Sequence, residues 1–270
     1  MHEPVYLLTL AAPPELEIRA ANMRDSGVKL VEVGGWGKNF DYSDLTAIRQ
    51  ARAILDTYDI EVYSYHPPFG GRYDVSVLDE GARAQAVQLN LHQVDVAAAL
   101  GAKYYVMHPS DRVPTADYLL RRRNAIRGIR SLCRAGENAG VAIAIENLPP
   151  GYVADRIDEL MWIVDACESE AAGVCLDTGH AHYAGWNIGE AIRRIGERLF
   201  TIHWHDNDGQ ADRHWLPGKG TIDWRQFFDA LKEIGWNRPI CLEAAPPEDI
   251  PYEQFAKQVR QALEAGRPMF

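Results

Sequence analysis

The stretch "VAIAIE", residues 141–146, carries the pattern on which the fold prediction depends. Side chains of a β-strand alternate between its two faces, so the three β-branched residues share one face and the two alanines share the other with Glu146. β-Branched residues suit a face that packs against helices, and small residues beneath an acid suit the crowded interior of a barrel. The stretch therefore predicts a strand that is buried on both faces and ends in an inward carboxylate.

The same unit recurs along the whole chain, because each short apolar run is followed by a longer amphipathic stretch with helical periodicity. The predicted strands are residues 5–10, 28–33, 60–65, 102–107, 141–146, 173–177, 199–205 and 238–243. The predicted helices lie near residues 14–26, 43–58, 79–100, 115–139, 155–170, 187–196, 223–234 and 252–265.

Eight alternations leave roughly 34 residues per unit, which predicts an α/β fold with a single (β/α)8 TIM barrel. Glycines occur between helix and strand, where a left-handed helix cap favours them, at positions 27, 101, 140, 173, 196 and 235. The alternative is a doubly wound open sheet, which usually has fewer strands and a glycine-rich phosphate loop after the first. Here "AAPPELE" (11–17) follows the first strand instead. No linker interrupts the pattern, so residues 1–270 are predicted to form one TIM-barrel domain.

The predicted strand ends carry acids and histidines, and in such a barrel these ends form the active site. The residues are Glu32, His66, His108, Glu146, Asp177, His203, His205 and Glu243. Strand parity points Glu146, Asp177 and Glu243 inward. One acid at a strand end is usually a helix cap or a solvated loop residue, but three inward carboxylates repel one another unless a cation or proton compensates. A divalent metal held by carboxylate and imidazole is therefore predicted.

Further candidates follow the strands. His180 comes three residues after Asp177 and can turn back toward the same site as a metal or substrate contact, whereas His182 is predicted to be structural. Trp36 and Phe69 lie in neighbouring loops and could stack on a sugar ring or cover the core.

The polar stretch "HWHDNDGQADRH", residues 203–214, extends the seventh predicted strand into a loop. Asp206 and Asp208 are predicted to shape this loop or face substrate, and Arg213 to anchor substrate oxygens. Asp212 and His214 are the open pair, either additional metal ligands or substrate contacts.

Bulk composition narrows the class of protein. The net charge of −10 weighs against nucleic acid as the main partner. No apolar run approaches the roughly 18–20 residues needed to span a bilayer, and the N-terminus lacks the basic region of a signal peptide. The four cysteines are widely spaced, as is typical of buried, reduced thiols. A cytoplasmic enzyme without membrane contact is predicted, and homo-oligomer formation stays open.

Five segments together resemble a known group of proteins. They are "GAKYYVMHPS", "AIENLP", "GVCLDTGHAHYAG", "HWHDNDG…DRHWLPGKGTIDW" and "CLE". They look like the xylose isomerase-like TIM-barrel superfamily, which contains sugar isomerases and epimerases and also the endonuclease-four type of apurinic/apyrimidinic endonucleases. The similarity runs roughly from the third predicted strand to the eighth.

For the epimerase branch, the resemblance implies one Mn²⁺, Co²⁺ or Mg²⁺ held by Glu146, Asp177, His203 and Glu243, with Glu146 and Glu243 also acting as the acid/base pair. For the endonuclease branch it implies three Zn²⁺ and nine ligands. The additional five would be His66, His108, His180, Asp212 and His214.

Three departures favour the epimerase branch: the "ENLPPGY" segment (146–152), the short loop between His203 and Asp212, and the "LPGKGTIDW" segment (216–224). The resemblance thus implies a divalent-metal-dependent sugar isomerase/epimerase acting on a ketose or keto-sugar, by Glu-mediated proton transfer through a metal-stabilised enediolate. Its partner would be a small carbohydrate.

The alternatives are a zinc-cluster phosphodiester hydrolase, a metal-dependent keto-sugar or inositol dehydratase, and a non-catalytic binding protein. A hydrolase of nucleic acid predicts a basic groove, for which Arg123, Arg127 and Arg130 are the best candidates. Such a stripe is more usually a solvated helix face.

Overall fold

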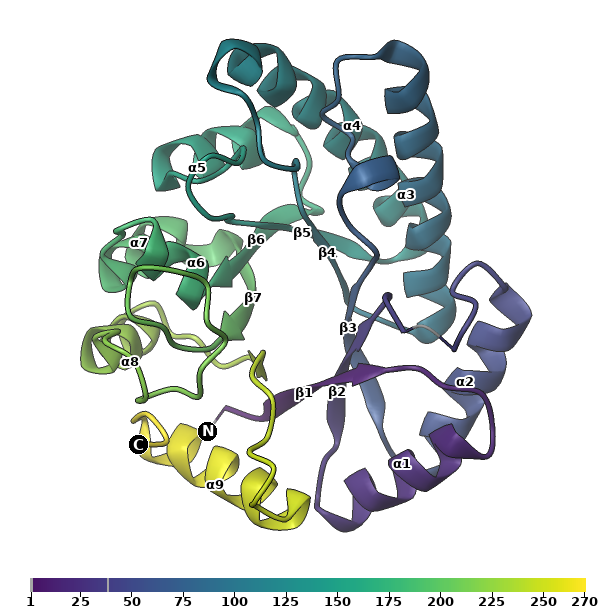
Figure 1. Ribbon diagram of the computed structural model, residues 1–270, viewed down its shortest axis with the longest axis vertical. Coiled ribbons are helices and arrows are strands. Elements are labelled where there is room, and N and C mark those ends of the chain that lie inside the picture. Colours follow the sequence, from purple (N-terminus) through teal and green to yellow (C-terminus); the bar gives the residue numbers. More distant parts are fainter. Residues whose placement is uncertain (1, 38) are drawn as a thin grey trace.

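Eight parallel strands close into a barrel in chain order within the computed structural model, which describes residues 2–37 and 39–270 (Figure 1). The strands are β1 (Pro4–Thr9), β2 (Leu30–Gly34), β3 (Glu61–His66), β4 (Tyr104–Met107), β5 (Ala142–Glu146), β6 (Ala172–Asp177), β7 (Leu199–Trp204) and β8 (Ile240–Leu242). Strand β1 pairs with both β2 and β8, which completes the ring. The predicted TIM barrel is confirmed.

The helices surround this ring on its outside (Figure 1). They are α1 (Glu15–Asp25), α2 (Leu45–Thr57), α3 (Glu80–Leu100), α4 (Tyr118–Ala139), α5 (Ile157–Ala166), α6 (Thr178–Tyr183), α7 (Ile188–Ile195), α8 (Trp224–Glu233) and α9 (Tyr252–Ala265). Each predicted helix is present; α9 has the predicted bounds, and the others have one or both ends shifted. Helix α6 is additional, since six residues are too few for a helical period to stand out in the sequence. No helix within the described residues is both long and apolar enough to cross a bilayer.

The predicted left-handed glycines are found at five of the six junctions. Gly101 and Gly140, for example, end α3 and α4 with φ of 72° and 73°. Gly173 contradicts the prediction, because it lies inside β6 and lacks a positive φ. A Cβ there would come within 2.5 Å of the Phe200 ring, so close packing rather than helix capping explains this glycine.

The barrel interior has an apolar floor. It is formed by inward-facing strand residues, including Ala144, as the alternation along residues 141–146 predicts. The floor is the cluster of Val5, Tyr63, Tyr104, Val106, Ala144, Cys175 and Cys241. The alternate residues of the same strands, such as Ile143 and Ile145, belong to the larger cluster beneath the helices. Polar side chains begin two residues beyond the floor, at the carboxyl ends of the strands.

The long connection from β7 to α8 folds over this end of the barrel because Asp206 ties it together. The Asp206 carboxylate accepts hydrogen bonds from the Gly218 amide at 2.8 Å and the Trp224 indole at 2.9 Å. The backbone of Asp206 also pairs with that of Trp215 in an antiparallel bridge. This is the loop-shaping role predicted for Asp206, and it brings residues 212–214 back to the barrel mouth.

Candidate metal centre

Four side chains from neighbouring strand ends meet at the mouth. Glu146, Asp177, His203 and Glu243 each offer one ligand atom, and these four atoms all lie within 4.8 Å of one another. Glu146 ends β5 and Asp177 ends β6, where it is the direct register partner of His203. Three of the four are at most 1% exposed, and the Glu243 side chain is 13% exposed. These are the four ligands expected for a one-metal site.

Several buried polar atoms of this group have no hydrogen-bond partner. They are Glu146 Oε2, His203 Nδ1 and Glu243 Oε2. His203 Nδ1 lies 2.9 Å from Glu243 Oε2 and 3.4 Å from Glu146 Oε1. A buried polar atom without a hydrogen bond is costly, and these ion-pair contacts meet the need of the three atoms only in part. Three carboxylates and an imidazole form a donor set suited to a divalent cation, and the residues therefore fit a metal.

The orientation of His203 is set by Glu32 from the middle of β2. His203 Nε2 lies 3.1 Å from Glu32 Oε1, and the Ser64 hydroxyl donates to Glu32 Oε2 at 2.6 Å. Both Glu32 and His203 are fully buried. With its Nε2 proton directed at Glu32, His203 presents Nδ1 to the other three carboxylates, as metal-binding histidines usually do when a carboxylate supports them. The sequence indicated Glu32 as an acid at a strand end but no partner for it.

A second group shares Glu146 with two histidines. His108 Nε2 lies 3.0 Å and His66 Nε2 3.4 Å from Glu146 Oε2. All three side chains offer ligand atoms within 4.8 Å of one another. The Phe69 ring packs against His108 with centroids 4.2 Å apart, and the Trp36 ring meets His66 edge-on at 5.1 Å. Trp36 and Phe69 are 41% and 52% exposed, so they form an aromatic wall beside these histidines.

A third group gathers around Asp212. Its Oδ2 lies 3.0 Å from His214 Nε2 and 3.3 Å from His180 Nε2. His205 joins the group: it stacks on His214 with centroids 4.2 Å apart, and with Asp212 and His214 it forms another set of ligand atoms within 4.8 Å. His205 Nε2 also lies 2.9 Å from Asp177 Oδ2. The sequence indicated the inward direction of His205 but not this contact, which depends on how the loop returns.

His180 reaches the mouth through the short helix α6. Asp177 caps this helix, accepting from the His180 amide at 2.6 Å, so the ring turns back toward the strand ends. His180 Nδ1 then lies 3.4 Å from Glu146 Oε1. His182, on the same helix, lies 2.8 Å from the Thr221 hydroxyl, in keeping with the structural role expected of it.

Arg213 is the one proposed substrate contact that faces elsewhere. Its guanidinium contacts Asp208 at 3.4 Å and lies over the Trp215 ring at 5.8 Å. Asp212 and His214, on either side of it, both turn to the mouth, so the loop directs Arg213 away. Its predicted role as an anchor for substrate oxygens is therefore not supported by its position.

Protonation in this cluster follows from the close packing of opposite charges. Burial alone would raise the pKa of Asp177, but His180 and His205 lower it to about 2. Burial likewise opposes ionisation of Glu146, yet His108 and His203 hold its pKa well below the usual range. Burial would lower the pKa of His214, but Asp212 and Glu243 raise it to about 9. Imidazolium protons thus balance the carboxylates, and a metal would compete with those protons.

Two adjoining cavities open at the mouth. One of about 220 Å³ is lined by the histidines and carboxylates, including His66, His108, Glu146, His180 and Asp212. The other, of about 690 Å³, lies between the ends of β1 and β8 and helix α9. Phe69, His214 and Glu243 line both.

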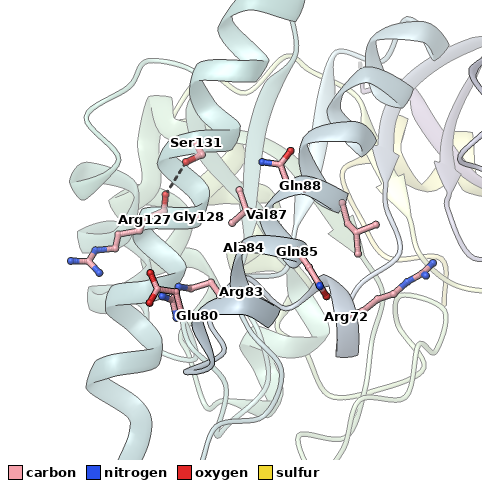
Figure 2. A pocket seen from close by; sticks show the side chains of 11 residues that line it. Arg72, Glu80, Arg83, Ala84, Gln85, Val87, Gln88, Arg127, Gly128 and Ser131 are labelled. Atoms are coloured by element: carbon pink, nitrogen blue, oxygen red, sulfur yellow. Dashed lines mark hydrogen bonds between the residues drawn. The ribbon is translucent and has the colours of Figure 1, made fainter.

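A larger groove of about 820 Å³ lies on the outer helical layer, between α3 and α4 (Figure 2). Its lining includes Arg72, Arg83, Arg127 and a single acid, Glu80, without histidine. Arg130, further along α4, binds the Ala166 carbonyl and Glu168. Arg127 and Arg130 therefore lie away from the mouth, and the chemistry of the groove does not match that of the metal centre.

Comparison with known proteins identifies the family. The family model described as xylose isomerase-like TIM barrel matches residues 20–266. The chain belongs to this family. The resemblance to this family seen in the sequence is thereby confirmed. The prediction that the protein is an enzyme is confirmed as well.

Similar proteins of this family include both branches. A crystal structure of a D-tagatose 3-epimerase-like protein superposes with a TM-score of 0.80 at 23% identity, with 97% of each chain covered. Fructoselysine 3-epimerase of Shigella flexneri is 24% identical over 88% of this chain and 87% of that protein. Probable endonuclease 4 of Thermoplasma acidophilum is 32% identical over 48% of this chain and 49% of its own length.

Proposed function

We propose that the protein is a divalent-metal-dependent isomerase or epimerase of a ketose or keto-sugar. The observation that carries the proposal is the convergence of buried carboxylate and imidazole ligand atoms of Glu146, His203 and Glu243 at the barrel mouth. With Asp177 they make a donor set for one Mn²⁺, Co²⁺ or Mg²⁺. The epimerase relatives, which match nearly the full length of the chain, support the same activity.

The reaction would depend on the two glutamates. A proton beside a carbonyl is weakly acidic, and the bound ion supplies the positive charge that stabilises the oxygen anion that develops. One carboxylate, Glu146 or Glu243, takes the proton from that carbon, and the other, carrying a proton, returns one. Because Glu146 ends β5 and Glu243 follows β8, the two carboxylates flank the site from different walls. Return to the opposite face of the same carbon gives an epimer, and return to the neighbouring carbon gives an isomer.

The second candidate is a phosphodiester hydrolase with three Zn²⁺. The groups around His66 and His108 and around Asp212 and His214 favour it, since each adds a set of ligand atoms to the central four. The half-length similarity to an endonuclease points the same way. Against it, Arg127 and Arg130 lie away from the mouth, and exposed Trp36 and Phe69 offer rings for a sugar. We therefore favour the sugar reaction.

Metal content and proton exchange test this choice. The protein would be purified in parallel with Mn²⁺ and with Zn²⁺, and the bound ions counted by mass spectrometry. Ketoses such as D-fructose and D-tagatose would be incubated in D₂O, with loss of the carbon-bound proton followed by NMR. One ion per chain and metal-dependent exchange support the sugar reaction. Three Zn²⁺ with cleavage of DNA at abasic sites, and no exchange, would reverse the ranking.

We also propose a cytoplasmic location. All four cysteines are buried thiols, which suits a reducing compartment.

A further inference from the structure

We propose that the natural substrate joins a sugar to a bulky apolar substituent, and that this substituent occupies the 690 Å³ cavity beside the metal centre. The inference rests on the proposed function, because the sugar part would lie at the metal. It names the substrate as a substituted sugar rather than a free one. A phosphorylated sugar is the main competing class.

The first support is continuity. Phe69, His214 and Glu243 line both the metal-facing cavity and the larger one. The larger cavity has roughly three times the volume of the other and lies within the range of about 300–1,000 Å³ typical of small-molecule sites. A ligand held at the carboxylates can therefore extend past Glu243 into a second, roomier space.

The second support is an apolar residue in an unusual place. Leu7 has the inward parity of Val5, which belongs to the barrel floor, and its register partner is Glu32. Yet Leu7 is 37% exposed and lines the larger cavity. At the mouth of this barrel, polar residues occupy the inward positions of the other strands. An exposed leucine among them is explained if an apolar ligand group covers it.

The rest of the lining agrees with this chemistry. Trp36 and Phe69 form one wall, with centroids 6.1 Å apart, and both are exposed. The segment after β8 adds further apolar residues, Ala244, Ala245 and Pro246. Rings and methyl groups of this kind bind aryl or alkyl groups by burial of apolar area.

Two polar side chains of the lining are engaged with the protein. Arg19 Nη1 donates to the Thr9 carbonyl at 2.6 Å, and the Tyr6 hydroxyl donates to the Ala256 carbonyl at 3.1 Å. A second sugar ring or a phosphate would need several free donors, whereas an apolar group needs none. Most of the lining residues are apolar, and this favours an apolar substituent.

A matched ligand series tests the inference on the Mn²⁺-loaded enzyme. The probes are D-fructose, its 1-O- and 6-O-methyl and benzyl ethers, and its 1- and 6-phosphates. Binding is measured by calorimetry and proton exchange by NMR in D₂O. We expect one benzyl ether to bind roughly tenfold or more tightly than D-fructose, with the methyl ether between them. Equal affinity across the series, or preference for a phosphate, would overturn the inference.

The two proposals fail in different ways. Proton exchange without any preference for a benzyl ether contradicts only the proposal of an apolar substituent. Tight benzyl binding without exchange on any probe removes the proposed reaction and leaves the cavity as a binding site.

Variants locate the preference within the molecule. Leu7→Gln makes the wall polar, and Ala245→Phe fills space from the loop after β8. Each is expected to bring the ratio of benzyl ether to D-fructose affinity close to one. Leu119→Gln, at a 67% exposed leucine of α4, is the matched control and should keep the wild-type ratio. If Leu7→Gln does not fold, Ala245→Phe still decides, and an unchanged ratio there contradicts the proposal.

Discussion

The floor and the mouth of the barrel are built by the same strands yet follow opposite rules. Ala144, Cys175 and Cys241 pack in the apolar floor, and the residues two positions further along the same strands are Glu146, Asp177 and Glu243. The floor is stabilised by the packing of its apolar side chains against one another. The mouth buries charge and leaves polar atoms without partners, which is costly unless a ligand completes it. A step of two residues thus separates the part that stabilises the fold from the part that binds and reacts.

The largest expected effect is a loss of turnover on substitution of Glu146 at the mouth. Glu146→Gln keeps the size and one oxygen of the side chain but removes its proton-transfer capacity. We expect turnover to fall by about 10²–10⁴-fold, and the melting temperature without metal to fall as well, because the amide cannot replace the negative charge that His108 and His203 stabilise. Proton exchange in D₂O and thermal denaturation measure the two. Glu197→Gln, at an exposed position after α7, is the control; a loss of activity in both variants would contradict the assignment.

A smaller effect is expected beneath the metal, at Glu32. Glu32→Gln weakens the support of His203 Nε2, and the affinity for Mn²⁺ should fall about 10–100-fold, as measured by calorimetry. The exposed Glu61, on the neighbouring strand β3, provides a control in Glu61→Gln. Unchanged metal affinity in Glu32→Gln would mean that Glu32 does not position the histidine.

A substitution in the floor should lower stability and leave the reaction almost unchanged. Val106 is fully buried in the inner cluster, and Val106→Ala leaves a small cavity there. We expect a loss of about 1–2 kcal/mol of stability, seen as a lower melting temperature, with kcat and metal affinity of the folded protein close to wild type. A large drop in kcat without loss of stability would show that floor and mouth are not separable in this way.

The smallest effect concerns pH in the metal-free protein. Burial would lower the pKa of His214, but Asp212 and Glu243 outweigh it and raise the pKa from 6.5 to about 9. Its charged form therefore contributes stability that is fully present below pH 6.5 and is lost as the pH rises through 9. The side chain is 41% exposed, so solvent screening keeps the effect small. Melting temperatures measured across this range should decline in wild type and decline less in His214→Asn.

A decline should persist when one Mn²⁺ is bound by Glu146, Asp177, His203 and Glu243, because His214 is not among these ligands. In a three-Zn²⁺ site the decline would be lost, because a coordinated imidazole carries no proton to lose. The same pH series on metal-loaded protein measures this. Loss of the decline in the metal-loaded protein would identify His214 as a ligand and contradict the one-metal site.

The sequence by itself determined what depends on neighbouring residues. A period of two along "VAIAIE" and its counterparts placed the floor on one face and the helix-packing residues on the other, and it directed Glu146, Asp177 and Glu243 inward. Eight repeats of strand and helix then predicted a closed (β/α)8 barrel. These inferences needed no knowledge of distant contacts.

Only the tertiary structure decided which groups meet. Glu32 and His203 are 171 residues apart in sequence, and closure of the ring brings them together. The bridge between Asp206 and Trp215 sets Asp212 and His214 at the mouth while Arg213 turns away. The cavity beside Leu7 likewise exists because β1, β8 and α9 converge there. Local periodicity specifies the direction of a side chain, but partners and cavities arise from packing across the whole fold.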